Sequence, residues 1–111
     1  MRKSGTKTRD DLVYDKQVQI CKAFANTSRL KMLDLLANGE RSGTELQAAL
    51  GIAQANISQH LAILKAAGVV ATRRDGNQVY CSLAIPEVKQ ACQLIRDVLR
   101  VQLRNGQKMV V

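Results

Sequence analysis

Several features that mark common protein classes are absent from this chain of 111 residues. No apolar run approaches the roughly 20 residues that a membrane-spanning helix needs, and no hydrophobic segment of the signal-peptide type follows the basic start MRKSGTKTRDD. The three cysteines are an odd number at wide spacing, which excludes a secreted disulfide framework and a CxxC zinc site. We therefore expect a cytoplasmic protein with reduced thiols and no membrane partner.

Signatures of catalysis are missing as well. The sequence has no Ser/His/Asp set, no paired carboxylates in an apolar context, no phosphate-binding glycine loop and no cluster of metal ligands. We therefore expect no enzyme activity. The chain has no internal repeat and no low-complexity tract, and its length suits a single domain with one modest core.

Acidic residues are few compared with basic ones. Seventeen Lys and Arg residues stand against nine Asp and Glu residues, which gives a formal net charge of +8. Such an excess favours a polyanionic partner such as nucleic acid, although a solvated basic surface has the same composition. Residues 1–9 are basic, polar and aperiodic, so we expect a flexible arm there that either attracts phosphate or is inert.

Helical periodicity accounts for most of the first 68 residues. Apolar residues recur at helical spacing over residues 10–25, and again in a second segment that ends at Gly39. A third helix is expected to start with Ser42 and Glu45 at capping-box spacing and to stop at Gly51. The segment AQANISQHLAILKAAG then predicts a fourth helix. Two short helices across a glycine turn indicate a helix-turn-helix.

The next segment, VVATRRDGNQVYCSL, is typical of a β-hairpin. Asp75 and Gly76 separate two β-rich runs, and a tight hairpin turn needs the positive φ that glycine adopts. A two-stranded hairpin behind a helix-turn-helix is a wing. Cys81 alternates with Val79 and Leu83 along the second strand, so we expect it to point into the core.

A last helix is expected to begin at Pro86, which can occupy the first turn without the loss of a needed donor. Val88, Cys92, Ile95 and Leu99 form an apolar stripe along it. This is more apolar surface than one small domain easily covers, so we interpret the stripe as a dimer seam. Packing within the chain is the alternative.

Three segments together, FANTSRLKMLDLL, SGTELQAALGIAQANISQHLAILKAAGVV and RRDGNQVYCSL, resemble the ArsR/SmtB family of bacterial winged-helix repressors. The resemblance covers roughly Val18 to Leu99. It implies a mainly α fold with a small β-hairpin, in which residues 10–104 form a winged helix-turn-helix domain between the arm and a C-terminal tail at residues 105–111. It also implies a homodimer on a pseudo-palindromic double-stranded DNA operator. The first and last helices would form its interface, through Val13, Ile20, Val88, Cys92, Ile95 and Leu99.

The chain departs from this family in the residues that sense a signal. In many members an inducer, often a metal ion, releases the DNA. The family's thiolate motif of the type ELCxCD is ELQAALG here, with Gln47 and Ala49 in place of cysteines, and the last helix contains no histidine. Both familiar metal sites are therefore missing, and any metal site is unknown. His60 matches a position that is commonly histidine in the family, and we interpret it as a packing or backbone-bonding residue and not as a metal ligand.

The fourth helix is the expected reading surface. Burial of its leucine and isoleucine side chains turns a set of amides, a hydroxyl and a methyl outward: Gln54, Ala55, Asn56, Ser58 and Gln59. Asn and Gln pair with adenine, Ser donates or accepts, and Ala meets a thymine methyl. A merely soluble helix face is the alternative, although such faces are usually rich in Lys and Glu. At the wing tip, the resemblance implies contacts with the DNA backbone or minor groove, from Arg73, Arg74, Asn77 and Gln78. Lys65, Arg41 and Arg29 are further, lower-ranked phosphate candidates.

We expect the inducing signal to act on two cysteines. In the resembled fold the helices that carry Cys21 and Cys92 pack together at the dimer interface, so oxidation, a sulfur species or a soft metalloid such as arsenite can join the thiols and release operator DNA. Two alternatives stay open at this point. The cysteines can be small buried hydrophobes in a repressor with another signal, or the winged helix can serve protein-protein contact.

Overall fold

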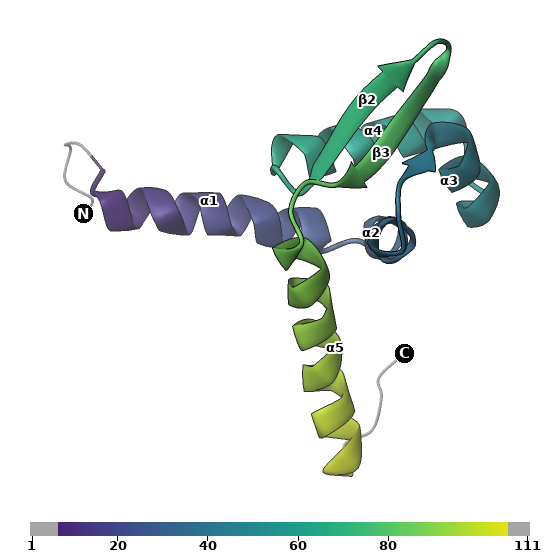
Figure 1. Ribbon diagram of the computed structural model, residues 1–111. Coiled ribbons are helices and arrows are strands. Elements are labelled where there is room, and N and C mark those ends of the chain that lie inside the picture. Colours follow the sequence, from purple (N-terminus) through teal and green to yellow (C-terminus); the bar gives the residue numbers. More distant parts are fainter. Residues whose placement is uncertain (1–6, 107–111) are drawn as a thin grey trace.

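The structure is a computed structural model that describes residues 7–106. Its elements are α1 (Arg9–Phe24), α2 (Thr27–Ala37), β1 (Arg41–Ser42), α3 (Gly43–Leu50), α4 (Gln54–Ala66), β2 (Val70–Asp75), β3 (Gln78–Leu83) and α5 (Glu87–Arg104). In Figure 1 the β2–β3 hairpin rises above a body formed by α2, α3 and α4, while α1 and α5 extend away from it. Most of the expected arm and tail, residues 1–6 and 107–111, lies outside the described residues.

Local signals in the sequence set the helix boundaries. Asn26 caps α2, since its side chain accepts a hydrogen bond from the backbone N–H of Arg29. Ser42 and Glu45 form the expected capping box at the start of α3. The hydrogen bonds that Glu45 accepts lower the pKa of its carboxyl group. Gly51 ends α3 with a φ of 67°, so the turn into α4 uses a conformation that favours glycine.

The sheet has one strand more than the sequence predicts. Its order is β1-β3-β2 and both pairs are antiparallel, with Arg41 opposite Cys81 and Arg73 opposite Tyr80. A strand of two residues is too short to show any alternation, so β1 has no signal in the sequence. The hairpin itself is as predicted, and Gly76 has a φ of 63° in its turn.

The core lies between the sheet and the helices. Ile57 and Leu64 of α4 are buried there, and Cys81 is fully buried, as expected from its position on β3. Val88 is only 5% exposed and packs in this core. Its expected place on the dimer seam is therefore wrong: the first turn of α5 still lies over the body of the chain, and only later turns leave it.

Arg29 holds the corner between α1 and α2. Its guanidinium donates hydrogen bonds to the carbonyls of Ala23 and Lys22, at 2.7 and 3.1 Å, and to Nδ1 of His60 at 3.3 Å. These internal partners occupy Arg29, so it is less available to a phosphate than the sequence suggested. The partner of His60 here is thus the side chain of Arg29 and not the backbone that the sequence suggested.

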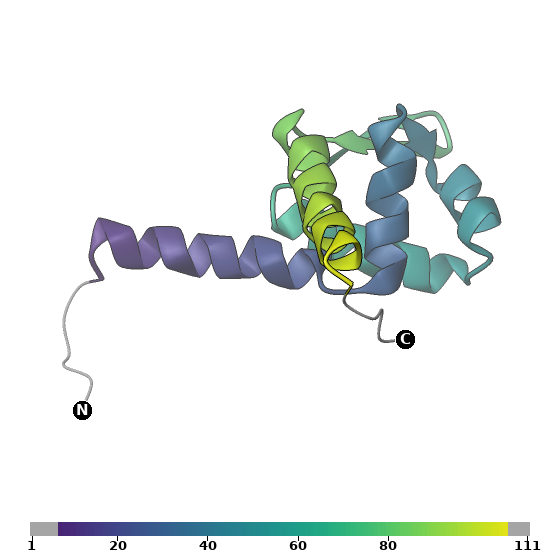
Figure 2. The same cartoon turned by 90° about the horizontal axis from the view of Figure 1, so that it is seen from below.

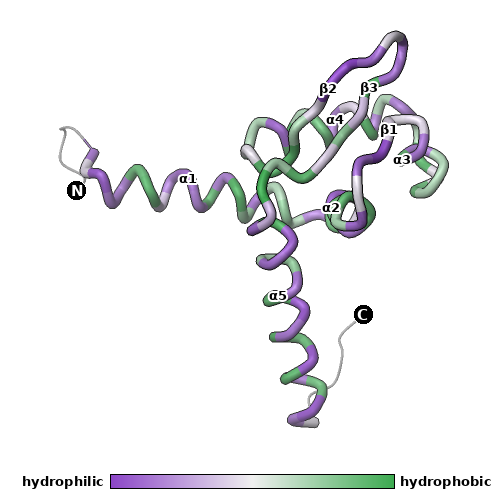
Figure 3. Tube along the Cα trace, in the orientation of Figure 1, coloured by the Kyte–Doolittle hydropathy of each residue, from purple (hydrophilic) through white to green (hydrophobic). Residues whose placement is uncertain are grey.

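Helices α1 and α5 carry most of the uncovered apolar surface. Figures 1 and 2 show α1 projecting from the body in both views, with α5 beside α2. Eleven of the fourteen large apolar side chains that are exposed within residues 7–106 lie on these two helices. Apolar segments recur along both in Figure 3. Neither they nor any other helix between residues 7 and 106 is long and apolar enough to cross a membrane.

Candidate DNA-binding surface

The outer face of α4 carries the five residues predicted to read DNA. Gln54, Ala55, Asn56, Ser58 and Gln59 are all exposed, whereas Ile57 between them is 2% exposed. The helix is fixed from behind by α3, β2 and α1, and the side-chain amide of Gln19 on α1 donates to the carbonyl of Ala66 at its end. A rigid, uncharged face rich in amide groups suits hydrogen bonding to base edges.

The start of α4 differs from the starts of the other helices on the body. Asn26 and Ser42 cap α2 and α3 with side-chain oxygens, but α4 has Ala53 at this position and no side-chain cap. Like that of α2, its first turn contains no acidic residue. The partial positive charge of a helix N-terminus attracts phosphate when no carboxylate neutralises it. The same end of α4 therefore offers both amide side chains and a favourable potential for DNA.

Arg73 is more tightly held than a free phosphate ligand. Its Nε and Nη2 atoms donate to the two carboxylate oxygens of Glu40 at 2.8 and 2.7 Å, and its guanidinium lies 4.5 Å from the centre of the Tyr80 ring. The hydrogen bond from Arg73 lowers the pKa of the Glu40 carboxyl group. The ion pair is thus present at neutral pH and is lost only as the pH falls through that lowered pKa. The sequence held no signal for this pairing, because the partners are 33 positions apart.

The remaining wing candidates are available at the tip. Arg74, Asn77 and Gln78 are exposed, and within residues 7–106 Arg74 has no ion pair and no side-chain hydrogen bond. Lys65 near the end of α4 is exposed too. Arg41 is a weaker candidate than the sequence suggested, because its Nε atom is buried without a hydrogen-bond partner.

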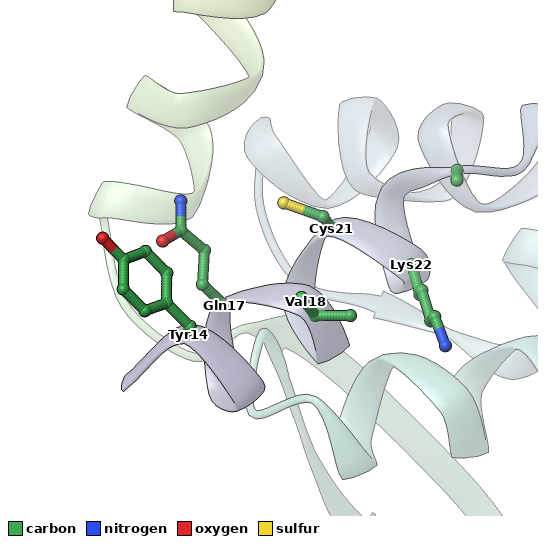
Figure 4. Close-up of a pocket in the computed structure, with 6 residues that line it drawn as sticks. Tyr14, Gln17, Val18, Cys21 and Lys22 are labelled. Atoms are coloured by element: carbon green, nitrogen blue, oxygen red, sulfur yellow. The ribbon is translucent and has the colours of Figure 1, made fainter. Parts of the chain in front are cut away.

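The two cysteines predicted to sense a signal have different surroundings. Cys21 is exposed and lies along one side of α1 with Tyr14 and Gln17 (Figure 4), in a shallow groove of that helix. Cys92 is partly buried on α5 and lines a cavity of about 200 Å³ next to α2. Burial raises the pKa of the Cys92 thiol, and nearby Asp34 raises it further. Cys21 is thus the more accessible thiol.

Beside Cys92, an ion pair joins α5 to α2. Arg96 donates to both carboxylate oxygens of Asp34, at 2.7 and 2.9 Å. Nothing in the sequence indicates this link, since its partners are 62 positions apart. It is a surface link between the middle of α5 and α2. No group of three or more His, Cys, Asp or Glu side chains that could hold a metal ion occurs in the part of the chain that the structure describes.

Known proteins share both the sequence and the fold. The model of the arsR family of bacterial regulatory proteins matches residues 26–72, which span α2, α3 and α4. The HTH-type transcriptional regulator Rv0081 of Mycobacterium tuberculosis is 38% identical over 88 residues, which is 78% of this chain and 77% of that protein. Its crystal structure covers 85% of this chain and 95% of its own, with a TM-score of 0.78 and 36% identity.

Two further solved structures are similar. A homodimeric winged helix-turn-helix DNA-binding domain of Mycobacterium bovis, Mb0332, matches with a TM-score of 0.83 and 31% identity, over 97% of this chain and 100% of that domain. Reduced HlyU from Vibrio cholerae matches with a TM-score of 0.71 and 36% identity, over 80% of this chain and 94% of its own. The chain belongs to the ArsR family and is a winged helix-turn-helix transcriptional regulator that binds DNA, not an enzyme.

Proposed function

We propose that the protein is a homodimeric repressor that reads a pseudo-palindromic operator through α4 and the wing, and that releases it on a thiol-directed signal. The observation that carries the first part is the outer face of α4. Its five exposed residues include no charge, in a chain with a net charge of +8. A surface that served only to attract phosphate would carry Lys and Arg there. This face instead has the groups that discriminate between bases.

Dimerisation follows from the apolar surface of α1 and α5. Val13, Ile20, Ile95 and Leu99 are between 37% and 57% exposed, and they belong to two helices that leave the body. A homodimer would cover them, and the similar domain from Mycobacterium bovis is homodimeric. A two-fold dimer presents two copies of α4, which suits half-sites in successive major grooves.

Titration of the protein against labelled duplexes tests the DNA part. An operator would first be selected from a random-sequence pool, and its binding compared with that of a scrambled duplex by fluorescence anisotropy at several salt concentrations. We expect tighter binding to the selected duplex, and an affinity for both that falls steeply with salt because phosphate contacts release counterions. Equal affinity for the two duplexes at every salt concentration would contradict a reading function for α4.

For the signal, we propose that Cys21 of one protomer and Cys92 of its partner are joined across the interface. Both thiols lie on the helices with uncovered apolar faces. Because Cys21 is exposed, its thiol can react first with the oxidant or the metalloid. A polysulfide would accept two electrons and two protons, so that one of its S–S bonds breaks as the bond between the two cysteine sulfurs forms. Arsenite would instead bind the sulfurs of both thiols and release two waters, which carry the thiol protons. Either link changes the packing of α1 on α5 and so the spacing of the two α4 helices.

Operator release with each reagent tests this signal. We expect disulfide compounds, polysulfide, arsenite or cadmium to release DNA from the wild type, and Cys21→Ser or Cys92→Ser to abolish the response without loss of basal binding. Because Cys81 is fully buried in the core, Cys81→Ala serves as the control that keeps the response. A wild type indifferent to all four reagents, or serine variants that still respond, would leave the cysteines as structural residues.

A further inference from the structure

The two wing arginines lie on opposite faces of the sheet. Successive residues of a strand point to opposite sides, so Arg74 shares a face with Thr72, whose partner on β3 is the buried Cys81. That face of the sheet turns toward the helices. Arg74 is on the same face but lies nearer the tip of the hairpin, past the buried residues. Arg73 lies on the other face, opposite Tyr80. The two neighbours therefore meet different surroundings, although they are chemically identical and adjacent in the sequence.

Arg73 crosses the whole sheet on its outer face. Strand β3 lies between β2, which carries Arg73, and β1, which Glu40 immediately precedes. Neighbouring strands are about 4.8 Å apart, so the side chain of Arg73 must pass over β3 to reach Glu40. Tyr80 is the residue of β3 that it passes, and the guanidinium lies 4.5 Å from the ring centre. We refer to Glu40, Tyr80 and Arg73 as the wing clamp.

The wing clamp ties the hairpin to the end of α2. Glu40 follows α2 after only Asn38 and Gly39, so this contact adds a side-chain link between the hairpin and the helical body beside the pairing of β1 with β3. A guanidinium fork that meets both carboxylate oxygens also restricts direction, which a single contact would not. If Arg73 left Glu40 for a DNA phosphate, the carboxylate would remain near DNA without a counter-charge. The arrangement favours retention of the pair on DNA.

We propose that Arg73 is a positioning residue that sets the angle of the wing through Glu40 and Tyr80, and that Arg74 is the wing residue that binds phosphate. This inference rests on the DNA-reading function proposed above. It divides two adjacent arginines into one that orients the hairpin and one that contacts the ligand.

Three variants separate these roles: Arg74→Gln, Arg73→Gln, and the exchange Glu40→Arg with Arg73→Glu, which conserves net charge and restores an ion pair of opposite direction. We expect Arg74→Gln to reduce the salt dependence of operator binding by the equivalent of about one phosphate. Arg73→Gln should weaken binding severalfold with an unchanged salt slope, and should speed amide hydrogen exchange in residues 70–83. If Arg73 orients the wing, the exchange variant should recover both the affinity for the operator and the protection from hydrogen exchange. If Arg73 instead binds a phosphate, the exchange moves that arginine to position 40 and should recover neither.

The outcome that overturns the inference is a salt slope that falls by one phosphate in Arg73→Gln but not in Arg74→Gln, or an exchange variant that binds as weakly as Arg73→Gln. A wild type without salt-dependent DNA binding would instead refute the proposed function. In that case hydrogen exchange alone decides on the wing clamp: protection that disappears in Arg73→Gln and returns in the exchange variant supports it, and unchanged protection refutes it. Thermal unfolding of each variant is the control that tests whether its domain is folded.

Discussion

Replacement of Ile95 by Asp is expected to convert the dimer into a folded monomer. Ile95 is 57% exposed in the single chain and lies midway along α5, where its neighbours Leu94, Val98 and Leu99 are exposed too. In the proposed dimer this position would be covered, and a carboxylate placed there without a partner would cost several kcal/mol. In the monomer the same carboxylate is solvated, so the fold of the domain should not change. Sedimentation and circular dichroism measure the two effects separately.

The matched control is Ile85→Asp. Ile85 is 53% exposed, close to the value for Ile95, but it lies in the connection between β3 and α5. We expect this variant to remain a dimer. If Ile95→Asp sedimented as a dimer, or if Ile85→Asp dissociated as readily, the interface would not be formed by the outer turns of α5.

Dissociation should also weaken operator binding strongly. In the dimer, the second α4 binds its half-site at a high effective concentration because the first is already bound. A monomer does not have this gain, which is on the order of 10²–10⁴ in affinity for linked sites. Binding to a single half-site should change little. The comparison of one-site and two-site duplexes therefore distinguishes loss of dimerisation from damage to α4.

The parts of the fold with local signals were predictable from the sequence. The capping box of Ser42 and Glu45, the positive φ of Gly51 and the turn at Gly76 each depend on a few neighbouring residues, and each lies where expected. The exposed face of α4 follows from the period of Ile57 and Leu64. Such features need no knowledge of distant parts of the chain.

The features that could not be predicted depend on contacts between distant segments. Val88 lies on the same apolar stripe as Ile95, and nothing in the period shows that the body of the chain already covers one and not the other. In the same way, a sequence shows that Arg29 and Arg73 are basic but not that backbone carbonyls, His60 or Glu40 occupy them. Whether a basic side chain is free to meet a phosphate thus depends on distant contacts that the sequence does not show.

Substitution of Gln54 or Ser58 by Ala should lower affinity for the operator more than affinity for a scrambled duplex. Both side chains are exposed on the first part of α4, where the helix has no acidic residue and no side-chain cap. Loss of a hydrogen bond to a base at either position should weaken the free energy of binding to the operator by about 1–3 kcal/mol. The phosphate ligands stay in place. The salt dependence should therefore be unchanged. Anisotropy titrations with both duplexes at two salt concentrations measure the difference.

Arg74→Gln is the control for this result, because removal of a phosphate ligand weakens binding to every DNA sequence alike. We expect it to lower the affinity for both duplexes by the same factor and to reduce the salt slope by about 1, a pattern opposite to that of Gln54→Ala. Ala62, exposed in the second half of α4, offers a further control, since Ala62→Ser should change neither affinity. If the Gln54 and Ser58 variants bound specific and non-specific duplexes with equally reduced affinity, the first half of α4 would contact the DNA backbone and another surface would read the bases.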